Sequence, residues 1–251
     1  MGLRFYYVIF ANLFRAPYML PYMSYMGAHP EKYSEERRYK MVNYIIDLMK
    51  KSGNIYTKGY GTENLPKEGG YIMYPNHQGK YDVLGMIHTH KKPCSFVMDE
   101  KRSHMPLVHQ VVDLLQGKRM VLDDVRQSFQ VINEVAEEVK QGKRYIIFPE
   151  GGYDEKKGNQ VEKFKAGTFK SAVKAKCPIV PVALIDSYKV FLGHTLKRIE
   201  TQVYYLKPLY YEDYKGLTTA QIANLVQEYI TQAVNYVLGK REDRTVLEGQ
   251  S

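Results

Sequence analysis

Residues 70–82 read GYIMYPNHQGKYD, and this stretch decides how the rest of the chain is interpreted. A short apolar run leads into a polar cluster that contains His77 and Asp82. Residues 145–152, YIIFPEGG, repeat this arrangement about seventy residues later. Open α/β sheets carry their functional groups beyond the carboxyl ends of their strands, so both clusters are predicted to lie at that edge of a sheet.

His77 and Asp82 are predicted to act as a pair. In a regular helix their separation would place the two side chains about 140° apart around the axis, so the chain must turn between them. Gly79 is the residue expected to permit that turn. His77 is therefore placed on a loop, and Asp82 in the first turn of the following helix, where the backbone dipole favours a carboxylate.

The pair has the chemistry of a general base and its orienting carboxylate. Imidazole titrates near neutral pH, and a buried Asp that accepts a hydrogen bond from one ring nitrogen fixes the tautomer. No Ser or Cys lies beside His77 in the sequence, which favours direct attack by a substrate hydroxyl. The alternative is a histidine that only caps or packs at a strand end. The apolar run before it, the helical pattern after it and the second cluster favour the catalytic interpretation.

These motifs resemble the signatures of the glycerolipid acyltransferases. NHQGKYD is similar to their NHxxxxD element, and FPEGG is similar to their FPEGTR element. Residues 164–167 (FKAG) and residues 179–182 (IVPV) match a further FKxG element and the final strand with an internal proline. The resemblance covers about residues 56–210 and is closest to the bacterial 1-acyl-sn-glycerol-3-phosphate acyltransferases.

The resemblance implies a reaction and the residues that perform it. A fatty acyl group would move from an acyl thioester, either acyl-CoA or acyl-carrier protein, to the sn-2 hydroxyl of 1-acyl-sn-glycerol-3-phosphate. The product would be phosphatidic acid for phospholipid synthesis. His77 would be the general base and Asp82 its partner, with Glu150 and Gly151 in the substrate-binding loop. No metal and no other cofactor is expected.

Recognition of the substrate phosphate is where the chain departs from the family. An arginine of FPEGTR is tied to the phosphate there, but Gly152 and Tyr153 occupy the Thr and Arg positions here. Consecutive glycine N–H groups can bind an anion, and cations from elsewhere are expected to help. The expected substrate-binding residues are Asn76, Glu150, Gly151, Gly152, Lys101, Arg119, Arg126 and Lys165, with Arg126 and then Arg119 favoured among the cations, and Arg102 and Lys118 as further candidates. For any single cation, a solvated surface charge is the simpler explanation.

The composition is that of one basic globular domain. The chain has 251 residues, a formal net charge of +9 and 23 tyrosines. This length suits a single domain with a full core, and the basic balance implies an anionic partner. Cys94 and Cys177 are the only cysteines and lack the spacing of a disulfide framework or a zinc site. They are expected to be reduced core residues.

Residues 1–52 are predicted to form an N-terminal, helical, membrane-anchoring segment. Its longest apolar run, residues 5–14, would cover about 15 Å as a helix, against about 30 Å for a hydrocarbon core. Arg15, Pro17 and Pro21 then interrupt the run, so a long core helix is not expected. An interfacial anchor is favoured over a helix packed on the domain. The protein is accordingly placed on the cytoplasmic side of the cell membrane, peripheral or monotopic, with the lipid surface as a partner.

Alternating strand and helix patterns predict an α/β fold, with a central sheet flanked by helices in one acyltransferase-type domain at residues 53–240 and a loose tail at residues 241–251. Strands are expected before His77 and at residues 55–60, 95–98, 119–122, 144–148, 179–184 and 202–206, the last at a sheet edge. Helices are expected at residues 34–51, 82–90, 105–115, 124–141, 169–175 and 218–238, with Gly239 ending the last.

Other functions are compatible with the sequence. A thioesterase, or a metal-dependent phosphoesterase that uses His77, Asp82 and Glu150 as ligands, is one alternative. A basic module that binds a membrane or RNA is another, but the chain lacks an RNA-recognition signature, so no nucleic acid partner is expected. Within acyl transfer, another glycerophosphate or lysophospholipid acceptor is the alternative. The acyl donor, its chain length and the oligomeric state are left open.

Overall fold

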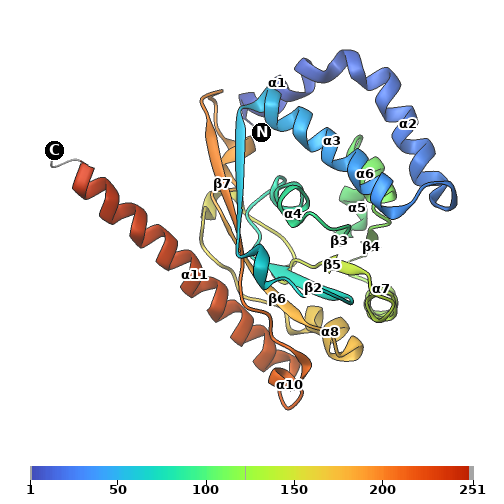
Figure 1. Ribbon diagram of the computed structural model, residues 1–251, viewed down its shortest axis with the longest axis vertical. Helices are drawn as coiled ribbons and strands as arrows, with labels where there is room; N and C mark the ends of the chain where they lie inside the picture. Colours follow the sequence, from blue (N-terminus) through green and yellow to red (C-terminus); the bar gives the residue numbers. More distant parts are fainter. Residues whose placement is uncertain (1, 122, 249–251) are drawn as a thin grey trace.

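A mixed β-sheet forms the centre of the molecule (Figure 1). The computed structural model describes the backbone of residues 2–121 and 123–248, and the side chains as far as residue 240. Within these residues the strand order is β1-β7-β6-β2-β5-β3-β4. The strands are β1 (Ile55–Tyr60), β2 (Tyr71–Pro75), β3 (Ser95–Asp99), β4 (Lys118–Met120), β5 (Arg144–Ile146), β6 (Ile179–Ile185) and β7 (Ile199–Tyr205). The predicted α/β fold with a central sheet is confirmed.

The sheet contains two groups of strands that run in opposite directions. The strands β6, β2, β5, β3 and β4 are parallel to one another, whereas β7 and β1 are reversed. The strand expected at residues 202–206 exists within β7, but its predicted place at a sheet edge is wrong, because β7 pairs with both β1 and β6. The alternation of its sequence reflects one well-buried face and not a missing partner.

Helices cover both faces of the sheet and divide the apolar core into two layers (Figure 1). The first layer is formed with α1 (Leu3–Asn12), α2 (Ala16–Ala28), α3 (Glu35–Gly53), α4 (Asp82–His90), α6 (Val108–Leu114) and α9 (Lys189–Leu192). The second is formed with α7 (Val125–Lys140), α8 (Lys170–Ala175), α10 (Tyr211–Tyr214) and α11 (Thr219–Glu248). Shorter helical turns are α5 (Glu100–Ser103), η1 (Leu13–Arg15), η2 (Pro30–Lys32), η3 (Thr62–Asn64), η4 (Glu155–Lys157) and η5 (Ala166–Phe169).

The two central strands are buried along their whole length. Each residue of β2 and of β6 is buried, as expected for nearly continuous apolar runs in a parallel region covered on both faces. β2 pairs with β6 on one side and with β5 on the other, both in parallel. The carboxyl ends of β2 and β5 therefore lie next to each other, on the side of the sheet where the parallel strands end.

The N-terminal segment is packed on the domain along one face. Arg4 is fully buried and donates to the carbonyl oxygens of Thr195 (2.7 Å) and Lys197 (2.5 Å). The predicted interruption is present, since α1 ends before η1 and α2 begins with Pro17 in its first turn. Pro21 nevertheless lies inside α2, whose buried methionines pack in the first core layer. None of the helices in the described part of the chain has the length and apolar character needed to cross a bilayer.

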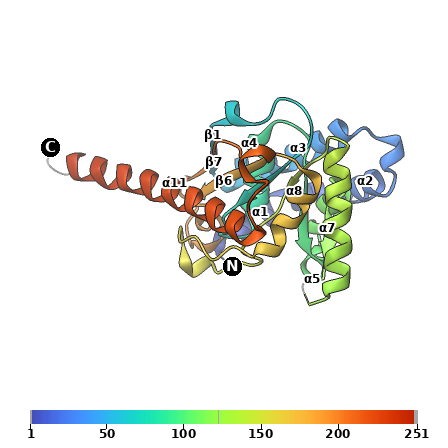
Figure 2. The same cartoon turned by 90° about the horizontal axis from the view of Figure 1, so that it is seen from below.

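The last helix is longer than the sequence predicts. Thr218 and Gln221 form the expected capping box, with Thr218 N–H donating to Gln221 Oε1 (2.9 Å). The expected end at Gly239 is wrong, because α11 continues to Glu248 and projects from the body of the molecule (Figure 2). Gly239 does not adopt the left-handed conformation with which a glycine ends a helix. The predicted tail thus begins as helix, and residues 249–251 lie outside the described residues.

Candidate active site

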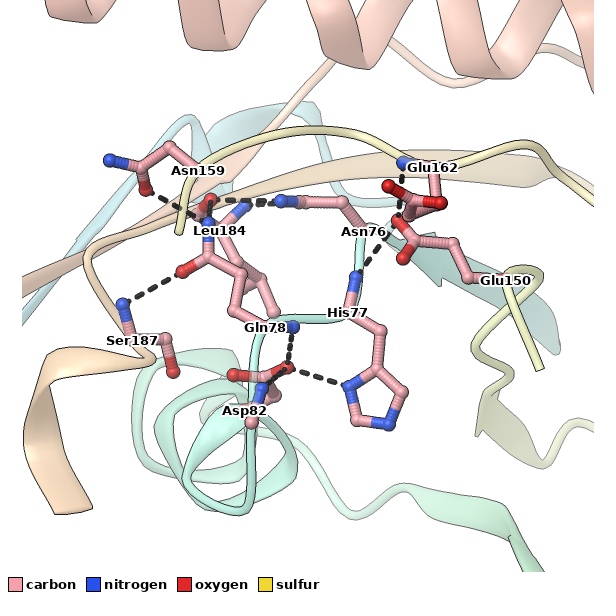
Figure 3. A network of polar contacts seen from close by, with 10 residues as sticks. Asn76, His77, Gln78, Asp82, Glu150, Asn159, Glu162, Leu184 and Ser187 are labelled. Atoms are coloured by element: carbon pink, nitrogen blue, oxygen red, sulfur yellow. Dashed lines mark hydrogen bonds and ion pairs between the residues drawn. The ribbon is translucent and has the colours of Figure 1, made fainter. Parts of the chain in front are cut away.

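Two loops meet beyond the carboxyl ends of β2 and β5. The first, residues 76–81, joins β2 to α4, and the second, residues 147–165, follows β5. Because β2 and β5 are adjacent and parallel, the prediction that both polar clusters lie beyond the carboxyl ends of strands in one sheet is confirmed. Figure 3 shows the polar contacts that link the two loops and the end of β6.

His77 and Asp82 form the predicted pair. His77 Nδ1 lies 2.7 Å from Asp82 Oδ2, and Asp82 is the first residue of α4. The carboxylate is fully buried, whereas 16% of the His77 side chain is exposed. A carboxylate only accepts hydrogen bonds, so it fixes the tautomer in which Nδ1 carries the proton. Nε2 is then the basic nitrogen, and in Figure 3 it points away from Asp82.

The turn between the two residues is made by the carboxylate and not by Gly79. Asp82 Oδ2 also accepts the N–H groups of Gln78 (2.6 Å) and Gly79 (2.9 Å), which wraps the loop around the carboxylate. The φ angle of Gly79 is outside the left-handed region. A Cβ atom at this position would come no closer than 3.6 Å to its neighbours. The expectation that a glycine is needed here is therefore wrong.

The His77 ring lies between two aromatic side chains of the second loop. The ring centroids of His77 and Phe148 are 4.0 Å apart, and those of His77 and Tyr153 are 4.6 Å apart. The two aromatic rings hold the imidazole in place, while 16% of the His77 side chain stays exposed. Neither aromatic neighbour follows from the spacing of the motifs, because the contacts join residues far apart in the sequence.

Glu150 supports the backbone of the histidine. Its Oε1 accepts the N–H groups of His77 (3.1 Å) and Glu162 (3.4 Å). Burial raises the pKa of Glu150 to about 7, against these two hydrogen bonds, which lower it. Oε2 is buried and has no hydrogen-bond partner in the described part of the chain. Glu150 thus ties the second loop to the first through Oε1 alone.

Two buried amides attach the first loop to the end of β6. Asn76 accepts Leu184 N–H (2.7 Å) and donates to Leu184 O (3.1 Å), so its amide extends the strand pairing of β2 and β6. Gln78 accepts Ser187 N–H (2.8 Å) and donates to Leu184 O (2.8 Å) and to Asn159 Oδ1 (2.9 Å). The structure therefore places both amides, including the one that was expected to bind substrate, against the backbone of the scaffold.

The FKAG and FPEGG elements contact each other in the structure. Gly151 has a φ of 72°, and a Cβ atom there would collide with the Lys165 ammonium group. Lys165 N–H donates to Pro149 O (2.8 Å), which fixes the contact between the two elements. Gly151 N–H is used by Phe148 O (3.3 Å), whereas Gly152 N–H has no acceptor among the described residues. One of the two amides expected to bind an anion is therefore available.

The two cysteines are confirmed as free and buried. Burial raises the pKa of each thiol to about 12, so neither is a reactive thiolate near neutral pH. Within the described residues no group of three or more His, Cys, Asp or Glu side chains is placed to hold a metal ion. Asp82 and Glu150 each direct an oxygen to backbone N–H donors.

Comparison with known proteins agrees with this geometry. The sequence model of the acyltransferase family matches residues 56–185. The chain belongs to this family. A probable 1-acyl-sn-glycerol-3-phosphate acyltransferase of Mycoplasma pneumoniae is 25% identical over 226 residues, covering 81% of this chain and 80% of the relative. The 1-acyl-sn-glycerol-3-phosphate acyltransferase of Borreliella burgdorferi is 28% identical over 146 residues, covering 57% of each.

A solved acyltransferase structure has the same fold. The crystal structure of the 1-acyl-sn-glycerophosphate acyltransferase PlsC from Thermotoga maritima superposes with a TM-score of 0.71. It covers 94% of this chain and 93% of its own, at 22% sequence identity. At this coverage the shared fold extends beyond both ends of the family match.

Two of the predicted cations, Arg119 and Arg126, have no contact with His77 or Tyr153 among the described residues. Arg119 lies on β4 and binds Asp113 Oδ1 (2.6 Å) and Ser103 Oγ (3.0 Å). Arg126 is exposed in the first turn of α7. The strand order separates β4 from β2 by three strand spacings, or roughly 14 Å. Lys101 is exposed on α5, and the next residue, Arg102, contacts Tyr153.

Two other cations approach the site through Tyr153. Lys80 Nζ lies 5.8 Å from the centroid of the Tyr153 ring, and Arg102 Cζ lies 5.4 Å from it. Lys80 belongs to the NHQGKYD stretch itself, and Tyr153 stands where the acyltransferase family has its arginine. These two features of the sequence could have indicated the cluster of Lys80, Arg102 and Tyr153.

Proposed function

We propose that this acyltransferase moves a fatty acyl group from an acyl thioester to the sn-2 hydroxyl of 1-acyl-sn-glycerol-3-phosphate, giving phosphatidic acid. The observation that carries the proposal is the His77–Asp82 pair, with a fixed tautomer and an outward Nε2. The names of the Mycoplasma and Borreliella relatives support the choice of acceptor. The same base with water in place of the acceptor would be a thioesterase, which no further contact favours.

The proposed mechanism is direct transfer with general-base catalysis. Nε2 of His77 takes the proton of the acceptor hydroxyl while the hydroxyl oxygen attacks the thioester carbonyl carbon. Asp82 stabilises the imidazolium that forms. As the tetrahedral intermediate collapses, the C–S bond breaks and the thiolate takes the proton back from Nε2. The reaction as proposed needs neither a metal nor a redox cofactor, because the thiolate is a good leaving group.

The second loop supplies the proposed contacts to substrate. Glu150 holds the backbone of His77 and so positions the imidazole that meets the acceptor hydroxyl. The unused N–H of Gly152 and the nearby ammonium group of Lys165 offer hydrogen bonds and positive charge to an anionic oxygen of the substrate. In the proposal, the long acyl chains of acceptor and product keep the protein at a lipid surface.

The proposed site of membrane contact is the outward face of α1 and α2. Phe10, Phe14 and Tyr18 are 75%, 67% and 83% exposed, although one face of the segment is docked on the domain by Arg4. Further exposed apolar or aromatic residues of this face are Leu3, Tyr6, Tyr7, Ile9, Leu13, Tyr22 and Tyr25. A surface of this kind suits the interface of a bilayer. The cytoplasmic side of the cell membrane is the proposed location.

Vesicle binding tests the membrane contact. Phe10→Ser combined with Phe14→Ser should reduce co-sedimentation with anionic vesicles at least tenfold. Tyr236→Ser, which removes an equally exposed aromatic ring from α11, should leave it unchanged. Equal binding by the double variant and the wild type would refute a role for this face.

Acyl transfer by the reconstituted protein tests the reaction. Wild type and His77→Ala are supplied with lysophosphatidate and palmitoyl-CoA or oleoyl-CoA, with and without EDTA, and phosphatidate is measured by mass spectrometry. The expected result is product formation that resists EDTA and is lost in His77→Ala. If neither CoA thioester gives product, acyl-carrier protein and other lysophospholipid acceptors are tried with the same pair of proteins. Failure with all of them, or activity that survives in His77→Ala, would refute the proposed mechanism.

A further inference from the structure

Two positively charged side chains, Lys80 and Arg102, lie against the Tyr153 ring, which contacts His77. Lys80 comes from the loop before α4 and Arg102 from α5, so their approach is produced by the fold. The Tyr153 ring is itself 4.6 Å from the imidazole, between centroids. Taken with the ring-to-cation distances, this puts both cations at most about 10 Å from the centre of the imidazole ring.

The chemistry of the proposed acceptor places its phosphate in this region. Only the C2–C3–O linkage separates the attacking hydroxyl from the phosphorus atom, so the phosphate cannot lie far from Nε2. Arg119 is already paired with Asp113, and Arg126 is exposed in the first turn of α7, so neither contacts Tyr153 among the described residues. Lys80 and Arg102 both lie against the Tyr153 ring, which in turn contacts the imidazole.

The two side chains have donors to spare. Lys80 makes one ion pair, with Glu155 at 3.1 Å, and its side chain is 34% exposed. Arg102 Nε lies 3.8 Å from Asp99 Oδ2, which is too far for a hydrogen bond. A guanidinium carries five N–H donors and binds phosphate through two of them at once, whereas the flexible ammonium group adds a point charge. Each cation can therefore turn toward an anion without leaving a buried carboxylate unpaired.

We infer that Lys80 and Arg102, gathered about Tyr153, form the binding site for the phosphate of the acceptor. This inference rests on the proposed function for the identity of the ligand. The two cations take over the task of the arginine that FPEGTR would supply, from different elements of the fold. Arg102 binds the phosphate oxygens and Lys80 adds charge, while the Tyr153 ring keeps both near the imidazole through cation–π contacts.

Equilibrium binding tests the site separately from turnover. A soluble short-chain lysophosphatidate, 1-hexanoyl-sn-glycerol-3-phosphate, is titrated calorimetrically into the wild type, Arg102→Gln, and Lys80→Gln combined with Arg102→Gln. Loss of one charge-assisted contact should raise the Kd about tenfold, and loss of both about a hundredfold. Glu155→Gln releases Lys80 from its ion pair and should lower the Kd several-fold, an effect that general damage to the fold does not produce.

Matched controls separate phosphate recognition from loss of charge or of structure. Lys67 and Lys207 lie at the opposite edge of the sheet, before β2 and after β7, so Lys67→Gln combined with Lys207→Gln should bind as the wild type does. Neutral 1-hexanoylglycerol should bind equally to all variants. Tyr153→Arg in the doubly substituted protein should restore part of the lost affinity for the phosphorylated ligand.

The outcomes distinguish the inference from the proposed function. Unchanged lysophosphatidate affinity in the doubly substituted protein overturns the inference, as does an equal loss for the neutral glyceride or no measurable binding by the wild type. Phosphate-dependent binding that disappears in the variants, without phosphatidate formation by the wild type, supports the phosphate site but refutes the proposed reaction. Turnover that survives both substitutions with an unchanged KM refutes the site and leaves the reaction intact.

Discussion

The two loops of the active site differ in how they are built. Residues 76–81 are held by a carboxylate only a few positions away, since Asp82 Oδ2 binds the His77 ring and two N–H groups of the same loop. Residues 147–165 have a carboxylate as well, since Glu150 accepts Glu162 N–H, but it also reaches outside the loop. Their polar and aromatic groups find partners elsewhere, as Glu150 does at the His77 backbone and Tyr153 does at the His77 ring.

This difference separates chemistry from recognition. The general base and its carboxylate are a short-range unit, so one stretch of sequence contains it. The groups that surround the base and the substrate belong to several elements and meet only when β2 and β5 are adjacent. Changes in the first loop should therefore affect the chemical step, and changes in the second should affect positioning, binding and stability.

The largest expected effect is at the base. His77→Ala and Asp82→Asn should each lower kcat by roughly 10²–10⁴-fold, because one removes the proton acceptor and the other removes the charge that stabilises its protonated form. Steady-state acyl transfer measures both. Asp124→Asn is the control, since Asp124 caps α7 and asparagine caps a helix equally well. A mild effect of Asp82→Asn would contradict the role of the Asp82 charge in stabilising protonated His77.

Removal of Glu150 should be the most damaging change in the second loop. Glu150→Ala leaves the N–H groups of His77 and Glu162 without their acceptor, and a loss of about 10- to 100-fold in kcat is expected. Glu150→Gln keeps an oxygen at the same place and should retain most of the activity. If the two variants lose activity equally, the carboxylate charge matters and its support of the His77 backbone does not.

Gly151 tests how tightly the second loop is packed. Alanine at this position is strained by a φ of 72° and must also displace Lys165, so Gly151→Ala should lower the free energy of unfolding by about 1–2 kcal/mol or more. Gly69 has a similar φ of 74° with open space around it, so Gly69→Ala measures the strain alone. Urea denaturation of both variants gives the cost of moving Lys165 as the difference. No difference would mean that the contact with Lys165 is loose.

The raised pKa of Glu150 predicts a pH dependence of stability. A native pKa of about 7, above the ordinary value of 4.5, means that the folded protein binds this proton more readily than the unfolded chain. The free energy of unfolding should therefore increase as the pH falls through 7, by about 1 kcal/mol between pH 8 and pH 6. The test is the difference between wild type and Glu150→Gln in urea denaturation at both pH values, which cancels the other titrating groups. A pH-independent difference would show that burial does not raise this pKa.

The smallest effect is expected at Gly79. Its φ is ordinary and a Cβ atom would meet neighbours at 3.6 Å or beyond, so Gly79→Ala should change the free energy of unfolding by less than about 0.5 kcal/mol. Activity should stay near that of the wild type. A large loss in either measurement would restore the glycine, in place of Asp82, as the residue on which the turn depends.

Much of the fold was predictable because its signals are local. The helix that begins at Glu35 has the expected cap, in which Ser34 accepts Arg37 N–H at 3.3 Å, and α4 has the expected bounds. The end of α11 was missed because a glycine stops a helix only if it adopts the left-handed conformation, which depends on the residues packed around it. The interior place of β7 was missed because a half-buried strand looks alike in sequence whether it has one neighbour or two.

The sequence by itself determined the His77–Asp82 pair and the strand and helix that carry it. These depend on residues within one or two turns of each other, where hydrogen bonds and apolar periodicity are set by the chain's own neighbours. Only the tertiary structure decided that Tyr153 stands beside the base with Lys80 and Arg102 against its ring, and that Arg119 pairs with Asp113. Strand order and the docking of loops depend on the packing of the whole core. The sequence position of a charged residue therefore does not tell which side chains it will contact in the folded protein.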